Sequence, residues 1–443
     1  MKKQGPKEDS SRKALSYSKF YGGKVGFAPK VPVRSLDDFS IWYTPGVAAV
    51  SMAIRNDPEL SYDYTGRWNT IAIITDGTRV LGLGNIGPEG ALPVMEGKAL
   101  IYNYLGGVNA IPLPLRAKTE EDLISFVKAL EPSLGGVNLE DIESPKCFEV
   151  LDRLRAEMKI PVWHDDQQGT AGVTLAALYN ALEITGRELK GSKLVLFGAG
   201  AANVATERLL VRAGADPKDI VVVDSKGILH PEREDIDQLM LKNKWKYEIA
   251  IHTNGDRVTG TLKDALKGAD VLVAAAGQGP EMVKRDEIEE MNRRAITFFL
   301  ANPVPEMLPA AARAAGAEVI ATGRSDYPNQ VNNSLLFPAI FRGALDVRAK
   351  TITDPMVVEA SKELASFARE KGITKSYIIP TMIQWEVYPR VASKVGQAAI
   401  REGVARKKLS VKESTEAAVT SIERSRKVMG ALRRAGIIVD PPE

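Results

Sequence analysis

The chain has 443 residues and a formal net charge of +3, from 59 Lys plus Arg against 56 Asp plus Glu. Charges this nearly balanced argue against an electrostatic nucleic-acid binder, in which positive charge is concentrated. A hydrophobic fraction of 44% excludes an intrinsically disordered chain, and the length predicts about two to four domains.

The cysteine count and the hydropathy pattern limit the cellular compartments in which the protein is expected. Cys147 has no second cysteine to pair with, which excludes an intrachain disulfide and fits a reducing compartment. No stretch approaches the ~20 apolar residues that a membrane helix needs. Residues 1–13 are polar and charged, so a loose tail is expected there rather than a signal peptide. We therefore expect a cytoplasmic protein that engages neither a membrane nor nucleic acid.

The first 165 residues mix short strands with helices. Two aliphatic runs flank Asp76 and Gly77 within residues 69–84, and because these two residue types tolerate positive φ, the pattern predicts a β-hairpin. A helix is predicted over residues 89–105, ended by Gly106 and Gly107.

From about residue 160 to 330, strands alternate with helices. One helix is predicted over 170–184 and is ended by Gly186. A second helix is predicted to follow Gly200 and to run to residue 212. The strand candidates are residues 160–164, 193–197, 220–224, 271–275 and 295–300. This alternation predicts a parallel sheet covered by helices on both faces.

After about residue 335 the pattern is mostly helical, for instance over 357–369, 386–402 and 411–434. The predicted fold class is α/β, with a Rossmann-like, doubly wound parallel-sheet domain and a second α/β unit built from both chain ends. We expect residues 1–164 to form the substrate-binding part and 165–332 the NAD(P)-binding domain. Residues 333–443 would be a helical part that returns to the first unit.

A dinucleotide fingerprint is present at Gly198-Ala-Gly200, which follows a strand, opens a helix, and precedes an acidic strand end at Asp224. The third fingerprint position, usually Gly or Ala, is Asn203, which puts close packing of helix and strand in question. Lys226 offers a partner for a 2′-phosphate, so NAD and NADP both remain open. The alternative is a turn that uses glycine only for its geometry.

Two acidic pairs lie at predicted strand ends: Glu140 with Asp141, and Asp165 with Asp166. Adjacent carboxylates repel one another, and Mg²⁺ or Mn²⁺ binds such oxygen ligands. By themselves the pairs are weak evidence, because most acidic dipeptides are simply solvated.

Seven motifs, taken together, resemble those of the malic enzyme family. They run in order and at compatible spacing from about residue 40 to 340: 43–47 (YTPGV), 75–84 (TDGTRVLGLG), 93–98 (PVMEGK), 139–141 (LED), 164–170 (HDDQQGT), 300–303 (LANP) and 330–334 (QVNNS). The length resembles the compact prokaryotic form of that family.

The resemblance implies oxidative decarboxylation of malate to pyruvate and CO₂, with reduction of NAD or NADP and a required divalent metal, Mg²⁺ or Mn²⁺. Lys98 would be the general base at the C2 hydroxyl, and Tyr43 the general acid that protonates C3 of enolpyruvate. The resemblance also implies a homodimer or a higher homo-oligomer.

The remaining site residues follow from the same motifs. Glu140, Asp141 and Asp166 would hold the metal, with Asp165 supporting them as a further catalytic residue. Arg79, Asn302 and Asn333 would bind the substrate. The residues assigned to the cofactor are Gly198, Ala199, Gly200, Ala201, Ala202, Asp224, Gly277, Asn302 and Asn332.

Other functions remain open at this stage. A dehydrogenase of another 2-hydroxy or amino acid would also use a lysine, but it would not need the three metal-binding carboxylates. A non-catalytic nucleotide-binding regulator would need neither Tyr43 nor Lys98. Taken alone, Lys98 lies on an apolar helix face, from which a lysine usually extends to solvent.

Overall fold

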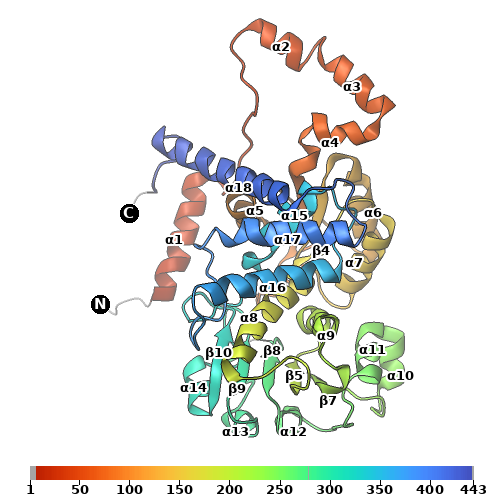
Figure 1. Ribbon diagram of the computed structural model, residues 1–443, viewed down its shortest axis with the longest axis vertical. Coiled ribbons are helices and arrows are strands. Elements are labelled where there is room, and N and C mark those ends of the chain that lie inside the picture. The colour runs from red at the N-terminus through yellow and green to blue at the C-terminus, as the bar shows by residue number, and fades with distance from the viewer. Residues whose placement is uncertain (1–5, 278, 442–443) are drawn as a thin grey trace.

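The computed structural model describes residues 6–277 and 279–441, and within them the strands form two sheets. Figure 1 shows the second sheet and its helices at one end of the molecule and the C-terminal helices across its middle. One hydrophobic core runs from the first sheet through the C-terminal helices to one face of the second sheet. A smaller core covers the other face of the second sheet. The predicted α/β class is confirmed.

The first sheet has the strand order β2-β1-β3-β4, and its pairs are parallel. Its strands are β1 (Thr70–Thr75), β2 (Asn109–Pro114), β3 (Gly136–Leu139) and β4 (Val162–His164). The hairpin predicted over 69–84 is wrong, because β1 has β2 on one side and β3 on the other and offers no free edge. The segment after β1 forms only one antiparallel bridge, between Val80 and Gly84.

The second sheet has the strand order β10-β9-β8-β5-β6-β7, parallel except for β7. Its strands are β5 (Leu194–Phe197), β6 (Ile220–Asp224), β7 (Gly227–Ile228), β8 (Val271–Ala274), β9 (Ala295–Phe299) and β10 (Ala317–Thr322). The sequence prediction missed β7 and β10. The strand order reverses between β5 and β8, and ligands bind at the carboxyl ends of the strands beside such a switch point.

Helices cover both sheets. Those of the first 165 residues after the N-terminal segment are α4 (Ser61–Tyr64), α5 (Gly87–Gly106), α6 (Glu120–Leu130) and α7 (Lys146–Glu157). Those around the second sheet are α8 (Thr170–Thr185), α9 (Ala201–Ala213), α10 (Ile236–Lys242), α11 (Lys244–His252), α12 (Leu262–Leu266), α13 (Arg285–Ile288) and α14 (Pro309–Ala314). Left-handed Gly107 and Gly186 end α5 and α8, as the sequence predicts.

The last hundred residues are helical, which confirms the sequence prediction. The helices are α15 (Phe337–Asp346), α16 (Asp354–Glu370), α17 (Val387–Arg401) and α18 (Val411–Arg434). Helices α15 and α18 pack against α5, and α16 packs against α8. The C-terminal part therefore returns to the helices that cover the first sheet. None of the helices within the described ranges is long and apolar enough to cross a membrane.

The N-terminal segment contains α1 (Pro6–Tyr21), α2 (Leu36–Trp42) and α3 (Val47–Asn56). The expected loose tail is wrong for residues 6–13, which belong to α1, while residues 1–5 lie outside the described residues. The Tyr21 hydroxyl at the end of α1 donates to the backbone oxygen of Val439 (2.6 Å), a long-range contact that no local pattern encodes. Figure 1 shows α2 and α3 apart from the rest of the molecule.

Candidate active site

Four carboxylates lie at the carboxyl ends of two neighbouring parallel strands. Glu140 and Asp141 follow β3, and Asp165 and Asp166 follow β4. Since Leu139 pairs with His164 in this register, the residues that follow emerge side by side. A π-helical turn, Asp165–Gly169, carries the second pair, and such turns are frequent at functional sites.

Lys98 reaches this group from α5 and is almost fully buried. Its Nζ donates to Glu140 Oε1 (2.7 Å) and to Asp165 Oδ2. The same ammonium lies 4.3 Å from the centre of the Phe337 ring, which adds a cation–π contact. The interpretation of Lys98 as a side chain that extends to solvent is therefore wrong.

Three residues that the sequence analysis missed hold these side chains in place. Asn138 Nδ2 donates to Glu140 Oε2 (2.9 Å), and its Oδ1 accepts from the Tyr102 hydroxyl (2.7 Å). Trp163 Nε1 donates to Asp165 Oδ1 (2.9 Å). Asn138 and Trp163 each stand two positions before a carboxylate, and this period-2 spacing along a strand was a usable signal.

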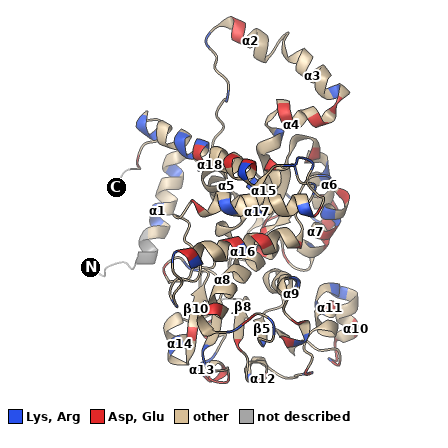
Figure 2. Cartoon of the chain, viewed as in Figure 1, with Lys and Arg blue, Asp and Glu red and all other residues tan. Residues whose placement is uncertain are grey.

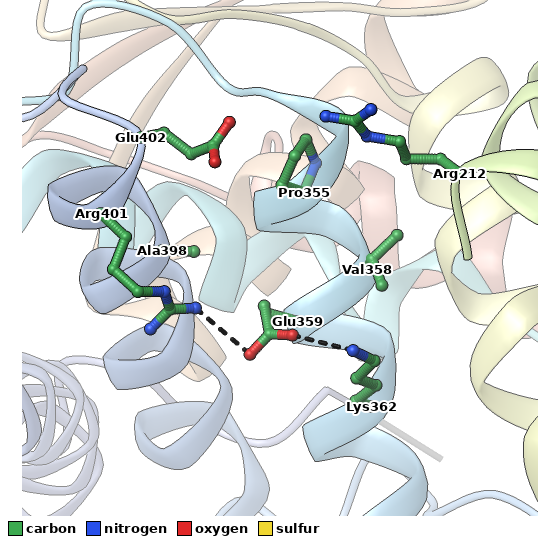
Figure 3. Close-up of a pocket in the computed structure, with 8 residues that line it drawn as sticks. All are labelled: Arg212, Pro355, Val358, Glu359, Lys362, Ala398, Arg401 and Glu402. Carbon is green, nitrogen blue, oxygen red and sulfur yellow. Dashed lines mark hydrogen bonds and ion pairs between the residues drawn. The ribbon is translucent and has the colours of Figure 1, made fainter. Parts of the chain in front are cut away.

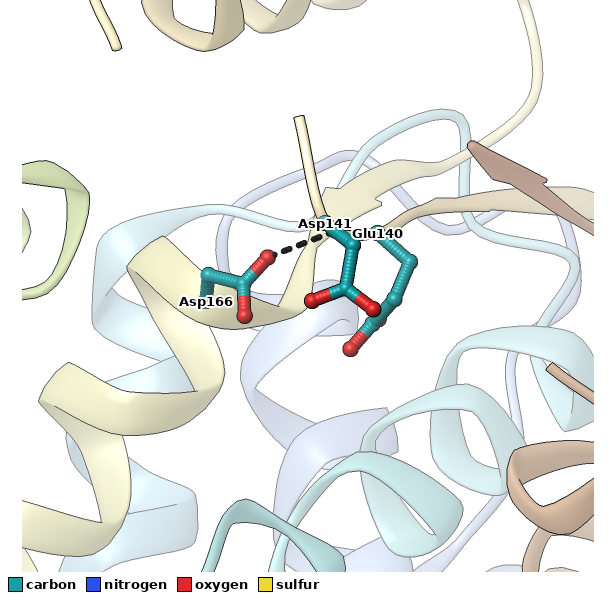
Figure 4. Close-up of side chains that lie close together, drawn as sticks. All are labelled: Glu140, Asp141 and Asp166. Atoms are coloured by element: carbon teal, nitrogen blue, oxygen red, sulfur yellow. Dashed lines mark hydrogen bonds between the residues drawn. The ribbon is translucent and has the colours of Figure 1, made fainter. Parts of the chain in front are cut away.

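Glu140, Asp141 and Asp166 offer oxygens within 4.8 Å of one another (Figure 4). Asp141 stands on a left-handed backbone, φ 53°, and its buried Oδ2 has no hydrogen-bond partner among the described residues. Asp166 Oδ2 accepts from the Asp141 backbone N–H (2.9 Å), which fixes the two residues relative to each other. Three clustered carboxylates with an orphaned oxygen fit a hard divalent cation.

The electrostatics of the group are unfavourable for bare carboxylates. Burial raises the pKa of Glu140, and it raises that of Asp141 to about 8, with the charge of Asp166 adding to both shifts. Burial by itself would lower the pKa of Lys98, but the charges of Asp165 and Glu140 outweigh it and the pKa is raised. The four carboxyl groups thus share one ammonium group, that of Lys98, which hydrogen-bonds to Glu140 and Asp165.

The dinucleotide turn has the geometry that its glycines require. Gly198 follows β5 with φ 95°, and a Cβ there would lie 2.5 Å from the backbone oxygen of Ala275. A Cβ at Gly200 would meet nothing within 4 Å, so a ligand has room to approach the start of α9, where Ala199, Ala201 and Ala202 also lie. Asn203 is fully buried, and its Nδ2 donates to the backbone oxygen of Phe197 (2.9 Å). Asn203 therefore joins helix to strand by a hydrogen bond.

Asp224, at the end of β6, is already engaged by cations. Its Oδ1 accepts from Arg233 Nη1 (3.0 Å) and its Oδ2 from Lys246 Nζ (3.2 Å). Lys226 forms its ion pair with Asp235 instead (2.8 Å). Asp224, the residue expected to contact the cofactor ribose, is thus surrounded by basic side chains.

The remaining predicted residues lie at strand ends or at the π-helical turn. Gly277 follows β8 with φ 153°, and Asn302 follows β9, with its Nδ2 donating to the backbone oxygen of Gly323 (3.4 Å). Asn332 caps the 3₁₀ turn Asn333–Leu335 through a bond to the backbone N–H of Ser334 (2.9 Å).

The two halves of the site meet at the π-helical turn. A Cβ built on Gly169 would lie 3.2 Å from the Asn333 Cβ, so Asn333 adjoins Asp165 and its turn. Helix α9, which begins at the dinucleotide turn, packs against the same turn. Arg79 also adjoins the group, because its backbone N–H donates to the Asp141 backbone oxygen (3.0 Å), while its side chain is exposed.

Tyr43 is not brought to the site by its own chain. It is the first residue after α2, its side chain is 71% exposed, and α2 stands away from α5 and β4 in Figure 1. Among the predicted catalytic residues it is the one that the structure separates from the carboxylates.

A pocket elsewhere in the structure lies between α9, α16 and α17 (Figure 3). Within it, Glu359 accepts from Lys362 (3.1 Å) and from Arg401 (3.3 Å). None of the predicted site residues lines this pocket, so it is separate from the carboxylate group. Its lining residues are Arg212, Pro355, Val358, Glu359, Lys362, Ala398, Arg401 and Glu402.

Comparison with known proteins gives consistent matches along the chain. Residues 23–122 match the family model for the malic enzyme N-terminal domain, and residues 167–400 match that for the malic enzyme NAD binding domain. The NAD-dependent malic enzyme of Geobacillus stearothermophilus is 46% identical over 87% of this chain and 78% of its own length. The NADP-dependent malic enzyme of Halomonas elongata is 43% identical over 90% of this chain and 96% of its own length.

A crystal structure of malic enzyme from Entamoeba histolytica superposes on this structure with a TM-score of 0.94 and 43% identity. The match covers 98% of this chain and 90% of that one. The likeness therefore extends over both sheets and the C-terminal helices.

Proposed function

This chain belongs to the malic enzyme family, and from that premise we propose which residues carry out its NAD(P)-dependent oxidation and decarboxylation of malate. Glu140, Asp141 and Asp166 hold a divalent metal, Mg²⁺ or Mn²⁺, and Lys98 is the general base. The observation that carries the proposal is the buried contact of Lys98 with two carboxylates beside the orphaned Asp141 oxygen.

The metal site is supported by the charge of the group. Burial and mutual repulsion raise the pKa values of its carboxyl groups, and a bound divalent cation relieves that repulsion. When bound, such a cation supplies Lewis acidity that stabilises the enolate formed as CO₂ leaves.

Lys98 is proposed to accept the proton of the C2 hydroxyl, and a bound NAD or NADP would supply the acceptor for the C2 hydride. Asp165 orients Lys98 through its hydrogen bond, and Trp163 holds Asp165 from the other side. Tyr43 then donates its hydroxyl proton to C3 of enolpyruvate as the enol proton leaves, and the tyrosinate takes back one proton.

Substrate and cofactor are proposed to bind at the strand ends around this group. Arg79 suits a malate carboxylate because its planar fork can bond both oxygens, and Asn302 and Asn333 orient the substrate. Asn332 and Gly277 lie toward the nicotinamide, with Gly198, Ala199, Gly200, Ala201 and Ala202 at the pyrophosphate and Asp224 at the ribose.

The domain division is proposed to be residues 1–164 with 333–443, and residues 165–332. It is supported by the second sheet, which is contained in residues 194–322, and by the packing of α15 and α18 on α5. A homodimer and a cytoplasmic location belong to the same proposal.

The test is an assay with L-malate, Mn²⁺ and either NAD⁺ or NADP⁺, which follows NAD(P)H absorbance and pyruvate together. We expect equal amounts of both products, loss of turnover with excess EDTA and recovery on adding Mn²⁺. Oxaloacetate without pyruvate would contradict the decarboxylating role, and full activity in EDTA would contradict the metal site.

Lys98→Ala, assayed in the same way, separates the base from the metal. We expect turnover to fall at least about 100-fold, within the range typical for general bases, while Mn²⁺ and cofactor still bind by calorimetry. Turnover near that of the wild type would contradict the assignment of Lys98.

A further inference from the structure

A second cavity adjoins the pocket of Figure 3 and shares Arg212, Pro355 and Glu402 with it. Its volume is about 630 Å³, which is within the range of small-molecule sites. Its walls come from α7, from α9, from the start of α16 and from the residue that follows α17. A ligand bound there would therefore touch the N-terminal part of the chain, the part with the second sheet, and the C-terminal part.

Three arginines line this cavity: Arg155, Arg208 and Arg212. Arg155 Nη2 donates to the backbone oxygen of Ile352 (2.6 Å), and Arg155 forms no ion pair among the described residues. Burial lowers the pKa of Arg155. The charge of Asp354 offsets this lowering only in part, and the charge of Arg208 adds to it. The positive charge of Arg155 is thus not neutralised by direct contact with a carboxylate.

The other two arginines lie one turn apart on α9, so they share a face of that helix. Arg208 Nε lies 3.2 Å from Asp354 Oδ2, but this buried N–H has no partner with hydrogen-bond geometry within the described ranges. Arg212 is exposed, and in the described part of the chain its side chain has neither a hydrogen bond nor an ion pair. The cavity therefore offers unused guanidinium donors, which suit phosphate and carboxylate oxygens.

The number of arginines and the acidic residues beside them narrow the class of anion. A phosphate monoester has three terminal oxygens for three arginines, whereas a carboxylate has two. Asp354 and Glu402 also line the cavity, and Figure 3 shows Glu402 across Pro355 from Arg212. Figure 2 shows acidic and basic residues interspersed along α16 and α17. Because ionised carboxylates only accept hydrogen bonds, the ligand needs hydroxyl donors as well as its anionic group.

We propose that this cavity binds a phosphate monoester that carries hydroxyl groups, the class to which sugar phosphates belong. The phosphate lies at Arg155, Arg208 and Arg212, and a hydroxyl group donates to Glu402. None of the residues proposed to bind malate, metal or cofactor lines the cavity. The site is therefore separate from the proposed active site, and its ligand does not compete with the cofactor.

The test is calorimetric titration of the full-length protein with ribose 5-phosphate. NAD⁺ or NADP⁺, whichever binds, is kept at saturation so that the cofactor site is filled, and no malate is present. We expect saturable binding of ribose 5-phosphate, weaker binding of inorganic phosphate, and no binding of ribose. The absence of saturable binding of ribose 5-phosphate would overturn the proposal. Inorganic phosphate that binds as tightly as ribose 5-phosphate would overturn the assignment to a hydroxylated monoester.

Arg212→Gln is expected to weaken the binding of ribose 5-phosphate at least about 10-fold, because a charge-assisted hydrogen bond is lost. The arginine has no partner in the described part of the chain, so the variant is expected to unfold at the same denaturant concentration as the wild type. Arg313→Gln is the matched control, since Arg313 is an exposed arginine in the last turn of α14 and outside the cavity. Equal affinity in Arg212→Gln and the control would overturn the site.

Glu402→Ala tests the hydroxyl contact separately from the charge. Removal of a carboxylate strengthens the binding of both anions, so the ratio of their two Kd values is the quantity to compare. We expect the preference for ribose 5-phosphate over inorganic phosphate to decrease in this variant, because the acceptor for the hydroxyl group is lost. A preference equal to that of the wild type would overturn the role of Glu402 in the proposed site.

Discussion

At the scale of single residues, the backbone conformation of Asp141 fixes the position of its carboxylate within the group. Asp141 is one of few non-glycine residues with positive φ, a conformation that costs free energy and persists where the surroundings impose it. The result is a buried oxygen without a hydrogen-bond donor next to two further carboxylates. Under the proposed metal site, Asp141 destabilises the metal-free protein and stabilises the metal-bound one.

Asp141→Asn is therefore expected to separate metal binding from folding. Without metal, the variant is at least as stable as the wild type, because a neutral amide replaces a carboxyl whose ionised form is disfavoured by burial and by the charge of Asp166. With Mn²⁺ at 100 times its Kd, the wild type gains about 3 kcal/mol in free energy of unfolding, and the variant gains less than about 1 kcal/mol. Denaturant titrations with and without Mn²⁺ measure both.

Asp256→Asn is the control for this measurement, because Asp256 is exposed and lies outside the cluster. It is expected to gain the same stability from Mn²⁺ as the wild type. An equal gain in Asp141→Asn would mean that Asp141 does not bind the metal.

The sequence identified the carboxylates and Lys98 because adjacent acids and motif residues are visible in the chain itself. It misjudged Asn203, whose size suggested poor packing of α9 on β5. The structure shows that the amide of Asn203 bonds two strand carbonyls, of Phe197 (2.9 Å) and Val273 (3.4 Å). Those carbonyl partners come from separate strands, and no local pattern indicates them.

At the scale of elements, Glu306 joins the loops after β8 and β9, which carry Gly277 and Asn302. The buried carboxyl accepts from the backbone N–H groups of Ala276 (3.0 Å) and Ala301 (3.2 Å). Burial raises the pKa of Glu306 to about 7, although these bonds favour the ionised form. The two loops, which are proposed to contact the cofactor, are thus both hydrogen-bonded to the same carboxyl group, that of Glu306.

The raised pKa makes stability depend on pH in a definite direction. Between the unfolded pKa of 4.5 and the folded pKa of about 7, the folded state holds a proton that the unfolded state releases. The contribution of Glu306 is therefore fully present below the unfolded pKa and is lost as pH rises through the folded pKa. From pH 5 to pH 8 the expected loss is about 2–3 kcal/mol.

Glu306→Gln is expected to remove this part of the pH dependence, measured by denaturant unfolding across the same range. Glu281→Gln, at an exposed position nearby in the sequence, is the control and is expected to behave as the wild type. A Glu306→Gln profile that matches the wild type would show that Glu306 does not titrate in this window.

At the scale of the whole molecule, the C-terminal helices close the fold onto its beginning. Arg342 in α15 is fully buried, pairs with Asp346 (2.7 Å) and donates to Asn69 at the start of β1. Residues 273 positions apart in the chain are thus joined next to β1, a strand of the sheet that carries the candidate-site carboxylates.

Arg342→Met is expected to destabilise the protein by about 3–5 kcal/mol, because it leaves the Asp346 carboxyl buried without its partner. The double variant Arg342→Met/Asp346→Leu is expected to recover most of that loss, since both charges are removed together. Thermal and denaturant unfolding of the three proteins measure the effect. No recovery in the double variant would mean that Arg342 acts through Asn69 rather than through the ion pair.

The sequence by itself predicted most of the helices and strands, and it predicted which carboxylates and which lysine lie together at the candidate site. Strand alternation, helix-ending glycines and acidic pairs are signals between neighbours in the chain, and β5, α8 and α18 formed where these signals predict them. Only the tertiary structure decided that β2 and β3 occupy both edges of β1, which side chains hold Glu140 and Asp165, and where Tyr43 lies. Those outcomes depend on contacts between residues far apart in the chain. The free energy of such contacts cannot be inferred from the pattern of neighbouring residues.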